Sequence, residues 1–164
     1  MKKVLKSKNI PEQSIIQFDC KNPDYIDSYF IKKETNASID QITREAFRSP
    51  QWTVNLMKLR NTIVKVFGLK TSDLIANEAD YYPIGSRAMA FTVVNRNENE
   101  IVMSENDKHL LFYVSVFHDK ANSLIYITTI VKFHNIWGKL YFLPVKPFHR
   151  LIVKSCTKKL LTSL

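Results

Sequence analysis

Glycine, cysteine and long apolar runs are all scarce in this chain. Only three of the 164 residues are glycine, and none forms the GxGxxG loop with which Rossmann domains bind a dinucleotide. The two cysteines, Cys20 and Cys156, lie far apart and show no CxxC or Cys/His spacing, so a disulfide framework and a metal site are not indicated. No stretch approaches the roughly 18 consecutive apolar residues that cross a bilayer, and no apolar segment follows the basic N-terminus. We expect a cytoplasmic protein of one domain, residues 1–164, with no cofactor.

Acidic residues are absent from the last quarter of the chain. Residues 120–164 contain eight Lys or Arg and no Asp or Glu, and so hold most of the net charge of +9. Lysine outnumbers arginine 18 to 6, whereas proteins that read nucleic acid favour arginine for bidentate contacts. The composition therefore favours a solvated basic surface over a nucleic-acid partner. A weak contact with an anionic membrane surface is the functional alternative.

Two helices are predicted in the first half, each from its start signal. Ser38 and Gln41 form an S-x-x-Q capping box that begins a short helix ending near residue 47. Ser49-Pro50 is the start signal of a second helix, and apolar residues then recur every three or four positions as far as residue 67. Before these helices, the segments 14–19 and 24–33 are rich in β-branched and aromatic residues, which predicts one bent strand or two.

The second half predicts an antiparallel meander followed by a helix. Four β-rich runs, at 88–94, 100–104, 109–117 and 124–133, are separated by turn-forming residues. In the last run the odd-numbered residues from Ile125 to Phe133 give one mainly apolar face, which needs a cover.

A C-terminal helix can supply this cover. Apolar residues step by four from Phe148 to Leu164, with Leu151 alongside, and a basic stripe of Lys146, Arg150, Lys154 and Lys158 follows another side. Two prolines, at positions 144 and 147, are expected in the first turn of this helix.

Four stretches of the chain resemble a known family. They are DYIDSYF, PQWTVNLMKLRNTIVKVFGLKT, ENDKHLLFYVSV and GKLYFLPVKPFHRLIVKS, and they resemble the domain-of-unknown-function 2867 family. That family is similar to the START-like and polyketide-cyclase-like (SRPBCC) superfamily. The resemblance implies an α+β helix-grip fold, in which a curved antiparallel sheet wraps around a long C-terminal helix, with two shorter helices between the first strand and the meander. It also implies an apolar cavity between sheet and helix that binds a small hydrophobic or amphipathic molecule.

Five residues are candidates for contacting such a ligand. Arg60 falls close to the apolar face of the second helix, where it either meets an anionic head group or pairs with a carboxylate such as Asp27. His109 and Tyr113 share one face of a predicted strand. Tyr141 and His149 lie on the last helix, beside the expected cavity. Each of these side chains also has a purely structural alternative in packing or ion pairing.

Catalysis has less support in the sequence than binding. No GxSxG motif or recognisable triad order occurs, and the four histidines show no metal-ligand spacing. An enzyme of cyclase or hydrolase type would require His109, Arg60 and Asp107 to converge on one substrate atom. The leading hypothesis is therefore a binding module rather than an enzyme.

Overall fold

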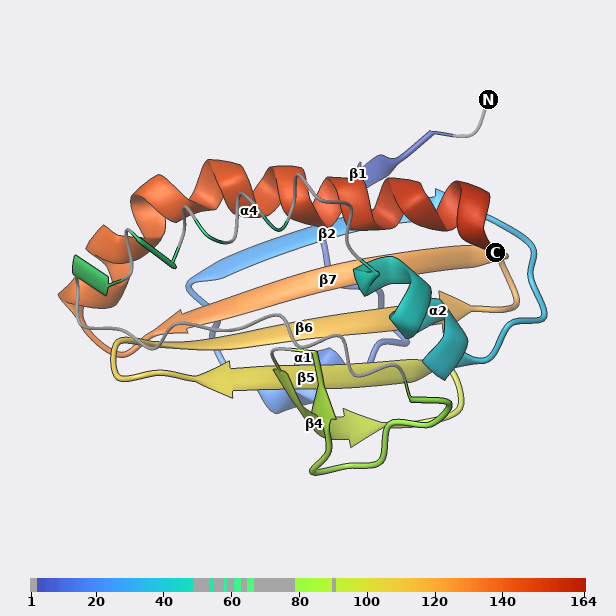
Figure 1. Cartoon of the computed structure of the whole chain (residues 1–164), viewed down its shortest axis with the longest axis horizontal. Coiled ribbons are helices and arrows are strands. Elements are labelled where there is room, and N and C mark those ends of the chain that lie inside the picture. The colour runs from blue at the N-terminus through green and yellow to red at the C-terminus, as the bar shows by residue number, and fades with distance from the viewer. Residues whose placement is uncertain are drawn as a thin grey trace.

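The structure, a computed structural model, describes residues 3–48, 79–89 and 91–164, together with six isolated positions between 54 and 66. These residues form an α+β arrangement in which a long helix lies along one side of a seven-stranded antiparallel sheet (Figure 1). The strand order is β1-β2-β7-β6-β5-β4-β3. The strands are β1 (Leu5–Ser7), β2 (Tyr25–Lys32), β3 (Arg87–Ala88), β4 (Phe91–Arg96), β5 (Glu100–Asn106), β6 (Leu110–Asp119) and β7 (Leu124–Phe133). The helices are α1 (Ile16–Asp19), α2 (Ile39–Phe47) and α4 (Ile136–Ser163).

The two faces of the sheet are covered by different parts of the chain. Asp27, Thr129, Val114 and Met103 are successive cross-strand partners, so their side chains share one face. Helices α2 and α4 both pack on this face, where the largest core cluster lies. Helix α1 covers part of the other face, where Ile16 packs against residues of β5 and β7. The alternating pattern predicted for β7 is confirmed, since its odd-numbered residues face α4.

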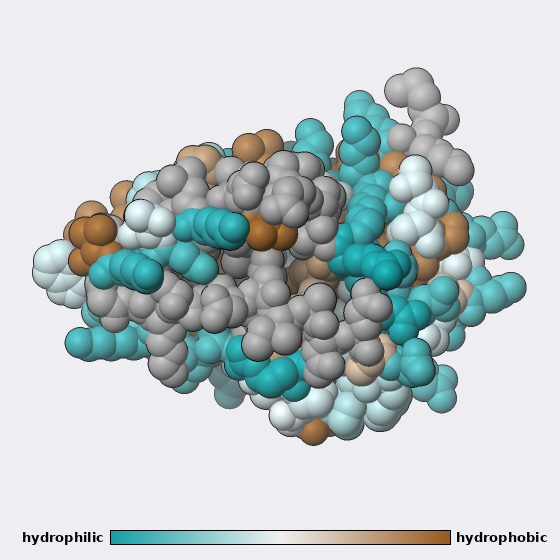
Figure 2. Space-filling view, viewed as in Figure 1, coloured by the Kyte–Doolittle hydropathy of each residue, from teal (hydrophilic) through white to brown (hydrophobic). Residues whose placement is uncertain are grey.

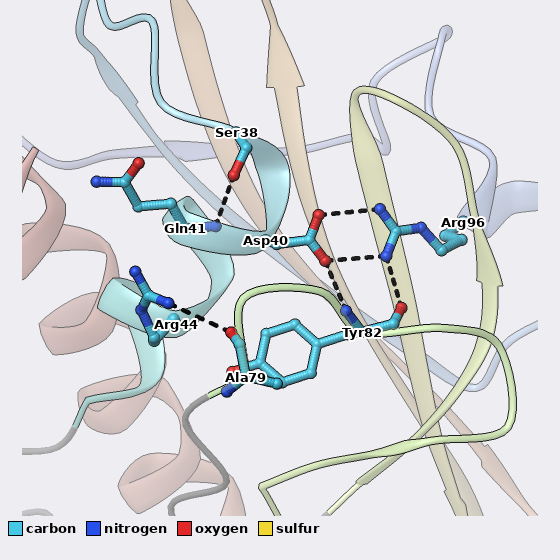
Figure 3. A network of polar contacts seen from close by, with 7 residues as sticks. All are labelled: Ser38, Asp40, Gln41, Arg44, Ala79, Tyr82 and Arg96. Carbon is cyan, nitrogen blue, oxygen red and sulfur yellow. Dashed lines mark hydrogen bonds and ion pairs between the residues drawn. The ribbon is translucent and has the colours of Figure 1, made fainter.

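Helix α2 begins where the capping box predicts. The Ser38 hydroxyl accepts a hydrogen bond from the Gln41 amide at 3.1 Å. Asp40, in the first turn of the helix, accepts hydrogen bonds from both Nη atoms of Arg96 at 2.9 and 3.0 Å and from the Tyr82 amide at 2.8 Å (Figure 3). Arg96 also donates to the Tyr82 carbonyl at 2.6 Å. This buried network joins α2, β4 and the 79–89 segment.

The prediction of a strand over residues 14–19 is wrong, because a buried carboxylate organises this segment as α1. Glu100, on the face of the sheet away from α4, is fully buried. It accepts hydrogen bonds from the Ser14 hydroxyl at 2.6 Å, the Ile15 amide at 2.7 Å and the Ser115 hydroxyl. The first two bonds hold the chain against the sheet just before α1 begins.

Helix α4 is longer than the sequence predicts. It begins at Ile136, where the Asn135 side chain caps the Gly138 amide at 3.1 Å, so Pro144 and Pro147 lie inside the helix and not in its first turn. Both prolines are on the exposed side, where water can hydrate the carbonyls that lose a helical donor, and the helix is curved over the sheet (Figure 1). Leu151 also points outward, at 55% exposed, so it does not belong to the covering stripe.

The second predicted helix falls largely outside the described residues. The isolated positions between 54 and 66 are helical, but Arg60 and the apolar face predicted from residue 52 to residue 67 are not among them. Within the described segments, no helix combines the length and apolar character needed to cross a bilayer.

Candidate functional site

A buried carboxylate lies between the sheet and α4. Asp27 is in the middle of β2, its side chain is 0% exposed, and its cross-strand partner Thr129 is buried as well. Within the described structure the Thr129 hydroxyl has no hydrogen-bond partner, and the polar neighbours of the Asp27 carboxylate are two cations and the hydroxyls of Tyr25 and Tyr29. An unsatisfied buried polar group costs about 1–3 kcal/mol. An unpaired hydroxyl beside a buried carboxylate therefore marks a place where a water molecule or a ligand group is expected.

Two cations from different elements approach this carboxylate. The Lys6 ammonium, on edge strand β1, lies 3.1 Å from Asp27 Oδ1, and Arg150 Nε, on α4, lies 4.0 Å from Oδ2. A buried carboxylate needs such compensation, because transferring an isolated charge out of water is very costly. Both cations are themselves nearly half exposed, which weakens each pair by solvent screening.

Two tyrosines flank Asp27 on the same face of β2. Arg150 Nε donates to the Tyr25 hydroxyl at 3.3 Å. Burial raises the pKa of Tyr25 to about 12, although the hydrogen bond from Arg150 opposes the shift. Burial likewise raises the pKa of Tyr29. Both phenols therefore keep their protons near neutral pH and can donate a hydrogen bond inside the site. We refer to Asp27, Thr129, Tyr25, Tyr29, Lys6 and Arg150 as the Asp27 site.

An aromatic wall adjoins the Asp27 site. The Phe142 ring meets Tyr25 edge-on at a centroid distance of 4.8 Å, and His149 lies 5.6 Å from Phe112 and 6.3 Å from Tyr25. Phe112 stacks on Phe91 at 5.4 Å, and both rings are only partly buried. The helix-facing side of the sheet thus combines a buried carboxylate with partly buried aromatic rings.

Two of the five predicted ligand contacts lie close to this site. His149 is part of the aromatic wall, and Tyr141 is buried in the core cluster that contains Phe142 and Val131. Tyr113 is separated from them, because it faces away from α4 and packs beside Ile16. Tyr113 therefore lies on the face of the sheet opposite to the Asp27 site.

His109 and Asp107 lie at the end of the sheet. Both belong to the β5–β6 turn, and His109 precedes β6 rather than lying on it. Its Nδ1 atom accepts a hydrogen bond from the Asn135 side chain at 3.1 Å, next to the start of α4. The convergence of His109, Asp107 and Arg60 in an interior site is not seen, since two lie in a turn and the third is outside the described residues.

Sequence reasoning missed the Asp27 site, although a signal for it exists. Asp27 is flanked by apolar and aromatic residues in the run YIDSYF, and a period of two places it on the same face as Tyr25 and Tyr29. A carboxylate on a buried strand face requires a partner. The sequence suggests Arg60 as that partner, whereas the structure supplies Lys6 and Arg150.

A polar pocket of about 280 Å³ opens beside the β6–β7 turn. It is lined by Glu34, Thr35, Asn36, His118, Lys120 and Ser123. His118 is buried on β6, and burial lowers its pKa, with Lys120 adding to the shift. Among the described residues, no group of three His, Cys, Asp or Glu side chains is arranged to hold a metal ion.

The sheet, its covering helix and the Asp27 site define an α+β protein with a partly polar interior. The model of the family described as "Protein of unknown function (DUF2867)" matches residues 20–156, and the chain belongs to this family. The match includes every residue of the Asp27 site except Lys6. No curated protein and no solved structure gives a significant match.

Proposed function

We propose that the protein binds a small amphipathic molecule between the sheet and α4, with the polar end of the molecule at Asp27. The observation that carries this proposal is the unpaired Thr129 hydroxyl next to the buried Asp27 carboxylate, beside partly buried aromatic rings. The Thr129 hydroxyl needs a hydrogen-bond partner, and the carboxylate oxygens have lone pairs for a further donor. One ligand hydroxyl group meets both needs.

The charges around Asp27 favour a hydroxyl over a carboxylate or an amine. A ligand carboxylate has no proton to donate to Asp27 and would bring a second negative charge beside it. A ligand ammonium would meet Lys6 and Arg150, which already place two positive charges against one carboxylate. The apolar body of the ligand would lie along Phe91, Phe112 and His149.

The helix-grip fold is part of the same proposal. A long C-terminal helix packed across one face of an antiparallel sheet supports that assignment and the similarity to the START-like superfamily. In such a fold the interface between helix and sheet is the natural place for an apolar ligand. No reaction is proposed for this site.

Competition between ligands of equal chain length tests the proposal. The uncharged fluorescent reporter N-phenyl-1-naphthylamine is bound first, and 1-decanol and decanoate are then compared as competitors. We expect decanol to displace the reporter at lower concentration than decanoate. Asp27→Asn should weaken decanol binding about tenfold, the equivalent of one charge-assisted hydrogen bond.

Glu100→Gln is the matched control. Glu100 is also a fully buried carboxylate, but it faces α1 instead of α4. This variant should bind decanol as the wild type does, even if it is less stable. Failure of the wild type to bind the reporter or either competitor would refute the proposal, as would equal losses of decanol affinity in the two variants.

A further inference from the structure

The outer side of α4 is apolar where a surface helix is normally polar. The large apolar side chains on this side are between 46% and 61% exposed, and they are Ile136, Trp137, Leu140, Leu143 and Leu151. Figure 2 shows apolar surface, in brown, at the left and upper edges of the view, where α4 runs in Figure 1. Single exposed apolar residues are ordinary, but five on one helix mark an interaction surface.

Helix geometry collects four of these five residues into one stripe, with Trp137 at its edge. Ile136, Leu140, Leu143 and Leu151 are separated by four, three and eight residues, which at 3.6 residues per turn keeps them on one side. The exposed prolines of α4 lie along the same stripe. The opposite side carries Phe142, Val145, Val153, Cys156 and Leu160, which are buried against the sheet. The helix therefore has an inner apolar face that the sheet covers and an outer one that no described residue covers.

Only positive charge accompanies this outer stripe. Lys154 and Lys158 continue it toward the C-terminus, and Lys139 lies beside it, all three exposed. The helix contains no acidic residue. A second copy of this chain is a poor partner, because in a symmetric dimer the same cations would face one another. A surface that is negative and can accept apolar side chains is the complementary partner.

We infer that the outer face of α4 docks on the surface of an anionic phospholipid bilayer. The helix lies parallel to the membrane, with Trp137, Leu140 and Leu143 inserted at the level of the head groups. Lys154 and Lys158 contact the anionic head groups, where each basic residue contributes about a fivefold gain in affinity at low salt. The stripe is independent of the Asp27 site, which lies on the inner side of the same helix.

Vesicle flotation with the full chain tests this inference. Vesicles of phosphatidylcholine with phosphatidylserine are compared with vesicles of phosphatidylcholine alone. We expect the protein to float only with the anionic vesicles and to be released as salt rises. Leu140→Glu combined with Leu143→Glu should reduce binding at least tenfold, and Lys154→Gln combined with Lys158→Gln about 25-fold at low salt.

Two matched controls keep the result specific to this face. Phe18→Glu replaces an exposed apolar residue on α1, beyond the opposite face of the sheet, and Lys21→Gln removes an exposed charge close to it. Both should float as the wild type does, as should Asp27→Asn, which separates this inference from the ligand proposal. Trp137→Phe should abolish the blue shift of tryptophan fluorescence that vesicles produce.

Three outcomes would overturn the inference. They are no binding to anionic vesicles, equal binding to both kinds of vesicle, and binding that survives the double leucine substitution. Light scattering that shows a dimer dissociated by Leu140→Glu, without vesicle binding, would assign the face to self-association instead.

Discussion

Replacing Glu100 by glutamine should change how stability depends on pH. Burial raises the pKa of Glu100 above its ordinary value of 4.5, and hydrogen bonds from Ser115, Ser14 and the Ile15 amide oppose the shift only in part. The folded protein therefore holds this proton more tightly than the unfolded chain does. The resulting stabilisation is fully present below about pH 4.5 and is lost as the pH rises through the folded pKa.

The size of the effect follows from the contacts. At pH values between the pKa of Glu100 in the unfolded chain and its pKa in the folded protein, the contribution of Glu100 to the unfolding free energy falls by about 1.4 kcal/mol per pH unit. Glutamine does not titrate, and it retains one carbonyl oxygen for the two serine hydroxyls. Its amide group faces the Ile15 amide, however, which is also a donor, so one hydrogen bond is lost at a cost of about 1–3 kcal/mol. Near pH 4.5 the variant should be less stable than the wild type, and this difference should shrink as the pH rises.

Urea unfolding followed by circular dichroism, for wild type and Glu100→Gln in parallel from pH 4.5 to pH 8, measures this difference. Other titrating groups are common to both proteins and cancel. A difference in unfolding free energy that stays constant, or that grows with pH, would refute the reasoning about this carboxyl group.

Three further substitutions or modifications have expected outcomes. Arg96→Met leaves the buried Asp40 carboxylate uncompensated and should lower the unfolding free energy in urea by about 3–5 kcal/mol. The control Arg87→Met removes an exposed ion pair and should lower it by under about 1 kcal/mol. Equal losses in the two variants would contradict this prediction. Gly138→Ala places a methyl group against a backbone carbonyl of the β5–β6 turn and should cost about 1–3 kcal/mol, measured as a lower Tm; an unchanged Tm would show that the turn can move away. Burial raises the pKa of Cys156 to about 12, so iodoacetamide should modify it only after unfolding, and rapid modification of the native protein, seen by mass spectrometry, would be inconsistent with this burial.

The elements that could be predicted from the sequence are those specified by local patterns. The alternation in β7 and the capping box at Ser38 depend on residues within a few positions of one another, and both are confirmed. The meander follows from short β-rich runs joined by turns. Family membership was also predicted, because its motifs extend over most of the chain.

The features that were missed depend on contacts between distant parts of the chain. Segment 14–19 has strand-like composition, yet it forms a helix because Glu100, about 85 residues away, binds Ser14 and Ile15. The Asp27 site joins β1, β2, β7 and α4, so no single stretch of sequence contains it. The basic stripe is divided in a similar way, since Arg150 turns toward Asp27 whereas Lys154 stays exposed.

The most direct test of the account is where a bound ligand lies. Isotope-filtered spectra of the labelled protein with unlabelled 1-decanol show NOEs between the bound decanol and nearby aromatic ring protons. Because rings lie on each face of the sheet, these NOEs show on which face the decanol binds. The account predicts NOEs from decanol to Tyr25, Phe112 and His149, and none to Tyr113 on the opposite face. NOEs to Tyr113 or to His118 in place of these, or no NOEs to the rings facing α4, would contradict a binding site at Asp27.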